Sequence, residues 1–164
     1  MRQLTAEDEP AIFTLRSNEA VNKYLDRIKA RSLEDARRFI NKVNNSIRNN
    51  EAIFWGICPA TETTIIGTAC LWNIDIQNEK AEIGYELLPA WQGKGLMQEA
   101  LSVIIDFGFA YMHLRAIVAM ADQQNERSVK LLEKHGFKRE ANKKSSLTKD
   151  DETSNMITYR LGRK

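Results

Sequence analysis

The spacing of hydrophobic residues predicts a helical N-terminal third. Apolar residues recur every three or four positions, the period of a helix with one buried face, at Leu33, Ala36, Ile40, Val43 and Ile47. Thr5 and Ser32 are each followed by acidic residues within one turn, which is typical of a helix N-cap. We therefore expect a helix from Thr5 to about residue 15, a short helical piece at residues 21–25, and a helix that follows Ser32.

Three short apolar runs follow, at residues 53–58, 64–72 and 81–88. They are rich in β-branched and aromatic residues, and polar turn signals separate them. Together they predict an antiparallel meander.

The C-terminal half predicts a β-α-β unit and a final pair of strands. Residues 95–112 are apolar except along one narrow stripe, which indicates a helix packed on both flanks. Residues 116–121 are continuously apolar, as in a strand that is buried on both faces. Asn125 caps a further helix that stops at Gly136, and strand-like runs at residues 137–140 and 156–161 enclose a polar loop near residues 149–152. The predicted fold class is α/β with a mixed (α+β) sheet, an antiparallel meander followed by one βαβ unit.

Composition and charge limit the number of domains, the partners and the compartment that we expect. A chain of 164 residues with 43% hydrophobic and 28% charged residues is long enough for one domain, which we expect to span residues 1–164. The net charge of +2 provides no concentrated basic surface, so no obligatory nucleic-acid partner is expected. Cys58 and Cys70 lie in apolar runs, as reduced buried thiols do, and no segment has the length of a membrane span. We expect a cytoplasmic protein without a membrane partner.

The most informative stretch is the turn between the third apolar run and the long helix. Pro89 ends the run, and Gly93 and Gly95 come directly before the helix. Unpaired N–H groups at a helix start attract anions, and glycines let a phosphate approach the backbone closely. A P-loop would need Ser or Thr after Gly93-Lys94, and a dinucleotide fingerprint would need a third glycine where Gln98 stands. Neither of these two phosphate motifs fits.

The residues of this turn resemble a known family. Gln92-Gly93-Lys94-Gly95-Leu96-Met97 is similar to the acetyl-CoA pyrophosphate loop of the GCN5-related N-acetyltransferases (GNAT), Gln/Arg-x-x-Gly-x-Gly/Ala, with Met97 in place of the small last residue. Residues 81–97, together with Asn125-x-x-Ser128 through Gly136-Phe137, resemble the ribosomal-protein N-acetyltransferase (RimJ/RimL) branch. The resemblance covers nearly the whole chain. It implies the GNAT acyl-CoA N-acyltransferase fold, with a splayed strand pair, and acetyl-CoA as co-substrate.

Cofactor binding can be assigned residue by residue. Pro89 cannot continue a sheet ladder, so the third strand is expected to part from its neighbour there and leave backbone groups free at Leu87 and Leu88. A pantetheine arm could take those hydrogen bonds like an added strand. The resemblance implies that Asn125 contacts the pantetheine arm or the adenosine part and that Ser128 lies near the sulfur. The predicted cofactor-binding residues are Leu87, Leu88, Gln92, Gly93, Lys94, Gly95, Leu96, Met97, Asn125 and Ser128.

The catalytic groups are predicted from the chemistry of acetyl transfer, in which an amine must lose a proton. Strand alternation places Glu82 and Glu86 on one face, with Gly84 leaving room between them. We predict Glu82 as general base and Glu86 as second candidate; both could equally be ordinary polar-face residues. The backbone N–H of Leu87 or Leu88 is the predicted oxyanion donor.

A proton donor for the departing thiol is harder to assign. Many members of the superfamily have a tyrosine on the helix before Gly-Phe, and Leu132 occupies that place here. Ser128 is the remaining hydroxyl, as in the RimJ/RimL branch, although a serine in the first turn of a capped helix is a common structural feature. His113 and His135 show no metal-ligand spacing, and no metal is expected.

The favoured function is transfer of the acetyl group from acetyl-CoA directly to an amine, which the resemblance suggests is a protein N-terminal α-amino group of the ribosomal-protein type. A small-molecule amine or an antibiotic is the alternative acceptor, with residues 21–40 and the 143–152 loop bordering the site. A non-catalytic acyl-CoA-binding module, suggested by Leu132, is an alternative of another class. A homodimer is left open.

Overall fold

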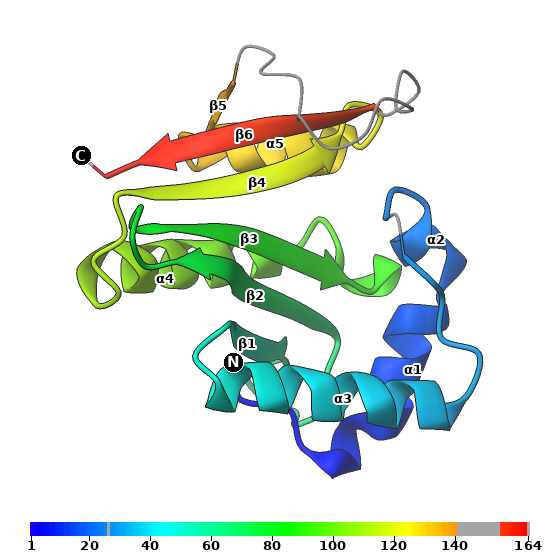
Figure 1. Cartoon of the computed structure of the whole chain (residues 1–164). Helices are drawn as coiled ribbons and strands as arrows, with labels where there is room; N and C mark the ends of the chain where they lie inside the picture. The colour runs from blue at the N-terminus through cyan, green and yellow to red at the C-terminus, as the bar shows by residue number, and fades with distance from the viewer. Residues whose placement is uncertain (26, 141–154, 164) are drawn as a thin grey trace, which may run out of the picture.

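The protein is described by a computed structural model that covers residues 1–25, 27–140 and 155–163. A six-stranded mixed sheet carries helices on both faces (Figure 1). The helical elements are η1 (Ala6–Asp8), α1 (Glu9–Ser17), α2 (Glu19–Asn22), α3 (Leu33–Arg48), η2 (Pro89–Trp91), α4 (Leu96–Ala110) and α5 (Glu126–Lys134). The strands are β1 (Ile53–Ile57), β2 (Gly67–Asp75), β3 (Lys80–Leu87), β4 (Ala116–Asp122), β5 (Lys138–Arg139) and β6 (Met156–Gly162). The polar loop predicted near residues 149–152 lies outside the described residues.

The N-terminal helices begin at the predicted caps. Ser32 Oγ accepts a hydrogen bond from the Asp35 N–H, and the Asp35 carboxylate accepts one from the Ser32 N–H, which forms a reciprocal capping box at α3. The first helix opens with the 3₁₀ turn η1 before it continues as α1. The short second piece is α2, which ends at Asn22, so the prediction that it extends to residues 24–25 is wrong.

The sheet has the predicted topology, with strand order β1-β2-β3-β4-β6-β5. Strands β1, β2 and β3 form the antiparallel meander, and β3 and β4 are parallel with α4 as the crossover between them. The second strand starts at Gly67 and not at residue 64, because residues 64–66 belong to the turn that enters it.

The helices cover the two faces of the sheet. Phe54 of β1 contacts Phe39 of α3 edge to face, with ring centroids 5.5 Å apart. Its neighbour Trp55 contacts Phe107 of α4 in the same way at 5.8 Å, on the opposite face. Two hydrophobic clusters result, one between α1, α3 and β1, and a larger one between the sheet, α4 and α5.

The parallel strands β3 and β4 stay together over a short distance. Their register pairs Lys80 with Ala116 and ends where Glu82 pairs with Val118. The two strands therefore splay from Ile83 onward, five residues before the predicted point at Leu88-Pro89. Beyond Glu82, β3 keeps its partner β2 to Leu87 and β4 keeps its partner β6 to Asp122, so each strand follows the twist of its own half of the sheet. Pro89 starts η2 and marks the end of β3, not the point of divergence.

Cys58 and Cys70 are free thiols, as expected, and both residues are partly buried. Within the described ranges, no helix combines the length and the apolar character that crossing a membrane requires.

Candidate functional site

The turn between β3 and α4 has the backbone shape of an anion cradle. Gly93 and Gly95 have positive φ angles of 76° and 79°, a region that strongly favours glycine. A Cβ atom built on either residue would meet nothing within 4 Å, so the concave side of the turn is open. The Glu99 N–H donates to the Gly95 carbonyl as the first bond of α4, which leaves the N–H groups of Leu96 and Met97 without partners inside the helix. These donors are the ones that the sequence predicted for a phosphate.

Two side chains of the turn frame this cradle. Met97 is 8% exposed and packs in the hydrophobic core, so its large side chain does not enter the cradle. Lys94 is exposed, and its ammonium lies 4.7 Å from the centre of the Trp91 ring. A small residue is therefore not needed at position 97, and a cation stands at the rim.

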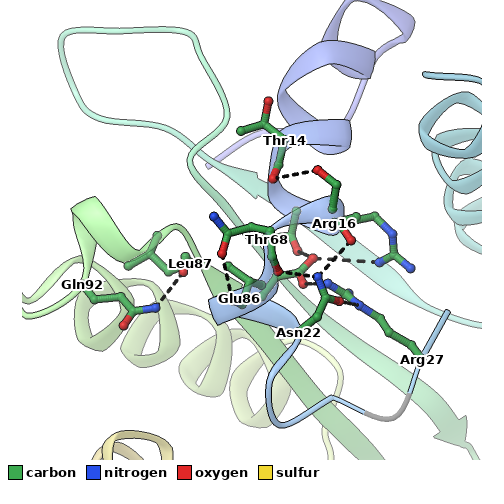
Figure 2. A network of polar contacts seen from close by, with 11 residues as sticks. Thr14, Arg16, Asn22, Arg27, Thr68, Glu86, Leu87 and Gln92 are labelled. Carbon is green, nitrogen blue, oxygen red and sulfur yellow. Dashed lines mark hydrogen bonds and ion pairs between the residues drawn. The ribbon is translucent and has the colours of Figure 1, made fainter. Parts of the chain in front are cut away.

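Gln92 joins the two sides of the splay. Its Nε2 donates to the Leu87 carbonyl at 2.9 Å, and its Oε1 accepts from Arg127 Nη1 at 2.8 Å (Leu87 and Gln92 are shown in Figure 2). Arg127 lies in the first turn of α5, where the helix dipole disfavours a cation. Sequence reasoning missed Arg127; a cation at this unfavourable end of a helix was the available signal.

The backbone donors of β3 differ from the prediction in one residue. The Leu88 N–H donates to the Ile66 carbonyl at 2.9 Å, so the prediction that it is free is wrong. In an antiparallel pair alternate residues bond to the partner strand, so the N–H groups of Leu87 and Tyr85 point away from β2, toward the splay. The N–H of Leu87 is directed toward the splay as predicted, whereas its carbonyl accepts from Gln92. Tyr85 supplies the second N–H in place of Leu88.

Glu82 is half-buried on the face of β3 that is opposite α4. Burial raises the pKa of its carboxyl, and a hydrogen bond from Asn73 Nδ2 to Oε2, 3.2 Å long, opposes the shift together with the charge of Lys80. A Cβ built at Gly84 would lie 3.2 Å from Cys70 Sγ and 3.7 Å from Trp72 Nε1. A side chain at Gly84 would therefore crowd Cys70, and room for an acceptor amine between Glu82 and Glu86 stays a prediction.

The Cys70 thiol is a poor candidate for a nucleophile. Burial raises the pKa of Cys70 to about 12, with a smaller opposing effect from a backbone hydrogen bond at Gly84. A neutral thiol is a poor nucleophile, so we assign Cys70 no chemical role.

Glu86 lies on the same face as Glu82 but is engaged in a polar network (Figure 2). Its Oε1 accepts from Thr68 Oγ1 at 3.0 Å and lies 3.9 Å from Arg16 Nη1, and its Oε2 forms an ion pair with Arg27 Nη2. Both carboxylate oxygens are therefore occupied by partners that would be lost if Glu86 took a proton. This arrangement argues against Glu86 as the second candidate base.

The same network ties the N-terminal helices to β3. Arg27 Nε donates to Asn22 Oδ1 at 2.7 Å, and Asn22 Nδ2 donates to the Arg16 carbonyl at 2.9 Å (Figure 2). Arg16 lies 3.8 Å from the centre of the Phe39 ring. Burial and the nearby charge of Arg27 lower the pKa of Arg16 to about 10, which Glu86 partly offsets. Glu86 thus holds the segment after α2 against the sheet.

Ser128 makes one hydrogen bond through its backbone N–H and another through its hydroxyl. Asn125 Oδ1 accepts the Ser128 N–H at 3.2 Å, so Asn125 caps α5 as predicted. Ser128 Oγ lies 2.8 Å from the Tyr85 hydroxyl across the splay. Its hydroxyl therefore does not serve the helix cap. Burial raises the pKa of Tyr85 to about 12, and the hydrogen bond with Ser128 opposes this shift.

Tyr85 was missed by sequence reasoning, whereas Leu132 is explained by the structure. Leu132 is fully buried in the main hydrophobic cluster, so a hydroxyl at this place of α5 would be inside the core. The signal for Tyr85 was a polar-tipped residue on the apolar side of β3, between Ile83 and Leu87.

A further hollow, but no metal-binding cluster, is present in the described part of the chain. No group of three His, Cys, Asp or Glu side chains within it lies close enough to hold a metal ion. An open hollow of about 680 Å³ lies beside η1 and α1, lined by Arg2, Asp8, Thr14 and Ile65 among others. It shares no residue with the cradle or with the Glu82 area.

Comparison with known proteins gives one consistent family. Residues 1–138 match the family described as acetyltransferase (GNAT) domain. An uncharacterised N-acetyltransferase of Bacillus subtilis strain 168, YoaA, is 33% identical over 140 residues, which are 85% of this chain and 79% of the relative. The [ribosomal protein uS5]-alanine N-acetyltransferase of Escherichia coli strain K12 is 33% identical over 112 residues, 68% of this chain and 58% of that protein. The solved spermidine N-acetyltransferase of Vibrio cholerae with CoA and spermine has a TM-score of 0.82 at 22% identity, covering 98% of this chain and 93% of the other, and so shares the fold.

Proposed function

The chain belongs to the GNAT acetyltransferase family and is an acetyl-CoA-dependent N-acetyltransferase, and we propose that it acetylates a protein N-terminal α-amino group. The observation that supports this proposal best is the half-buried Glu82 carboxylate, whose pKa burial raises, two residues before Gly84, which has no side chain. The relative that acts on an alanine of ribosomal protein uS5 supports the same class of acceptor.

We assign the donor site to the splay between β3 and β4. The pyrophosphate is held by the backbone N–H groups from Gly93 to Met97, whose conformation is set by the two positive φ angles of the turn. Lys94 adds charge at the rim. The pantetheine arm hydrogen-bonds the N–H of Leu87 on β3 as an added strand does.

Two further groups are assigned to the cofactor. Gln92, which bonds the Leu87 carbonyl, exchanges that bond for the cofactor when the arm enters. Asn125 orients the start of α5, so that Ser128 is near the sulfur.

Glu82 is assigned as the general base. The acceptor nitrogen attacks the thioester carbonyl carbon, the carbonyl electron pair moves to oxygen, and the amine proton passes to the Glu82 carboxylate directly or through one water. The backbone N–H of Leu87 or Tyr85 stabilises the oxyanion. Collapse of the intermediate re-forms the carbonyl and breaks the C–S bond, with the electron pair leaving on sulfur.

A raised pKa suits a base for this acceptor. A peptide α-amine has a pKa of roughly 8, against roughly 10.4 for a lysine amine, so it is more often neutral near pH 7. Burial makes Glu82 a stronger base than an exposed carboxylate. A stronger base together with a more acidic amine favours an α-amine over a lysine side chain.

A panel of acceptors tests the proposal. Thiol release from acetyl-CoA is measured with a peptide that has a free α-amine, with the same peptide blocked at its N-terminus but bearing one lysine, and with spermidine. The free α-amine peptide is expected to give the highest kcat/KM, and Glu82→Gln is expected to lower it about 100-fold. Asn73→Ala removes one hydrogen bond to the same carboxylate but keeps the carboxylate, so it serves as the control and is expected to lower kcat/KM less than Glu82→Gln does.

A polyamine acceptor is the second candidate. An E. coli spermidine N(1)-acetyltransferase is 31% identical over 71 residues, and the exposed Trp72 beside Glu82 could contact a cationic chain. Turnover of spermidine but not of the free α-amine peptide would replace the first assignment with this one.

A further inference from the structure

The proposed acetyl transfer leaves one strong contact of the splay unused, the hydrogen bond between Tyr85 and Ser128. The two residues come from β3 and α5, and their oxygens lie 2.8 Å apart although they are 43 residues apart in sequence. Tyr85 lies three residues beyond Glu82, where the β3–β4 pairing ends. The contact therefore spans the splay itself.

Either oxygen can be the donor in this contact, and the Tyr85 hydroxyl also lies 3.5 Å from the Ser128 carbonyl oxygen. A phenol is a stronger hydrogen-bond donor than an aliphatic hydroxyl, and Tyr85 keeps its proton because burial raises its pKa to about 12. When Tyr85 donates to Ser128 Oγ, the hydrogen of Ser128 must point to a third group.

We propose that Tyr85 is a positioning residue for departure of the thiol: it holds Ser128 so that the Ser128 hydroxyl donates its hydrogen bond to the CoA sulfur. This inference rests on the proposed function, which puts the sulfur of the cofactor near Ser128. It accounts for acetyl transfer in a chain whose α5 has Leu132 where many relatives have a tyrosine.

The role fits the energetics of the leaving group. A free thiol has a pKa of roughly 8.5, so the thiolate leaves readily once the C–S bond breaks, and a hydrogen bond suffices to stabilise it. Ser128 gives that bond while both hydroxyls keep their protons. The proton released by the amine stays on Glu82 until solvent takes it, and CoA leaves as thiolate or takes a proton from water.

Kinetics of single and double variants test the proposal. Tyr85→Phe removes only the hydroxyl, and kcat is expected to fall about tenfold with an unchanged KM for acetyl-CoA, because one hydrogen bond to the reacting centre is disordered. Ser128→Ala is expected to lower kcat at least as much. In the Ser128→Ala background, Tyr85→Phe is expected to have no further effect, since Tyr85 acts through Ser128. Tyr111→Phe, on an exposed tyrosine of α4's C-terminal end, is the matched control and is expected to change nothing.

A second measurement needs no acceptor and so separates this inference from the proposed function. The ultraviolet absorbance of the thiolate reports the pKa of the CoA thiol when CoA is bound to the protein. Wild type is expected to bind CoA with a lowered thiol pKa, and both Tyr85→Phe and Ser128→Ala are expected to move it back toward the value of free CoA. This holds even if every amine in the acceptor panel fails.

Three results would overturn the inference. The first is an unchanged kcat and thiol pKa in Tyr85→Phe. The second is an equal loss of kcat from Tyr85→Phe with and without Ser128, which would mean that Tyr85 acts on its own. The third is loss of CoA affinity in a folded Tyr85→Phe protein with kcat preserved, which would make the contact a clasp for the cofactor.

Discussion

Glu82 and Glu86 show how strongly the surroundings of a residue decide its chemistry. Both face the same side of β3 and flank Gly84. Glu82 has one amide partner, Asn73, whereas Glu86 has two arginines and a threonine. The sequence could place both acids on one face through strand alternation, but the partners of Glu86 include Arg16 and Arg27, which no spacing rule connects to β3.

The raised pKa of Glu82 has a consequence for stability. A carboxyl whose pKa is higher in the folded than in the unfolded state binds more protons when folded, so the free energy of unfolding falls as the pH rises between the two values. We expect Glu82→Gln, whose amide oxygen can still accept from Asn73, to be more stable than wild type at pH 7 and to lose this advantage at about pH 4. Thermal denaturation at both pH values measures the difference.

Glu62→Gln, in an exposed loop, is the control for this comparison and is expected to leave stability unchanged at both pH values. A Glu82→Gln protein that is less stable than wild type at pH 7 would contradict the assignment of a desolvated carboxylate. The expected gain in stability with loss of activity is the usual relation at a catalytic residue.

At the level of elements, the β3–α4 turn combines two properties that a glycine can supply together. Gly95 is the N-cap of α4 and has a positive φ, and its missing side chain leaves the cradle open. Gly136 has a similar φ of 84° at the end of α5 but lies outside the cradle. Both glycines have a left-handed backbone conformation, but only Gly95 lies in the cradle, so a comparison of the two distinguishes the effect of backbone strain from the effect on ligand binding.

Substitution of these glycines gives a matched pair. Alanine at Gly95 or at Gly136 is expected to cost about 1 kcal/mol of stability, because each residue would be held in the left-handed region. Gly95→Ala is also expected to weaken CoA binding about tenfold or more, since its methyl group would meet the phosphate, whereas Gly136→Ala keeps wild-type affinity. Chemical denaturation and calorimetric titration with CoA measure the two effects. Equal CoA affinities for the two variants would contradict the location of the cradle.

Elements could be predicted from the sequence to the extent that local rules govern them. Ser32 and Asn125 fixed the starts of α3 and α5, and Pro89 fixed the end of β3. The point of splay could not be read in this way, because it depends on the twist of each half of the sheet and not on Pro89. The pairing of the Leu88 N–H with Ile66 was missed for a related reason, since it requires the strand register.

At the scale of the whole molecule, the sheet consists of two halves joined along a short seam. The meander β1-β2-β3 and the pair β4-β6 share the three residue pairs from Lys80 to Glu82, and α4 connects them as the crossover (Figure 1). Side chains bridge the open part of the seam, with Gln92 bonding Arg127 and Tyr85 bonding Ser128. The topology could be predicted from the order of apolar runs, whereas these bridges join residues 35 and 43 positions apart that only the folded chain brings together.

The central claim is that the splay from Ile83 onward, with the turn that follows it, is the donor site. Hydrogen exchange of backbone amides, measured on the full chain with and without saturating CoA, tests it most directly. Binding is expected to slow exchange at Tyr85, Leu87 and the amides from Gly93 to Met97, because the cofactor accepts their hydrogen bonds, and to leave the hollow near Asp8 and Ile65 unchanged. Slower exchange around that hollow, with no change between Tyr85 and Met97, would contradict the account.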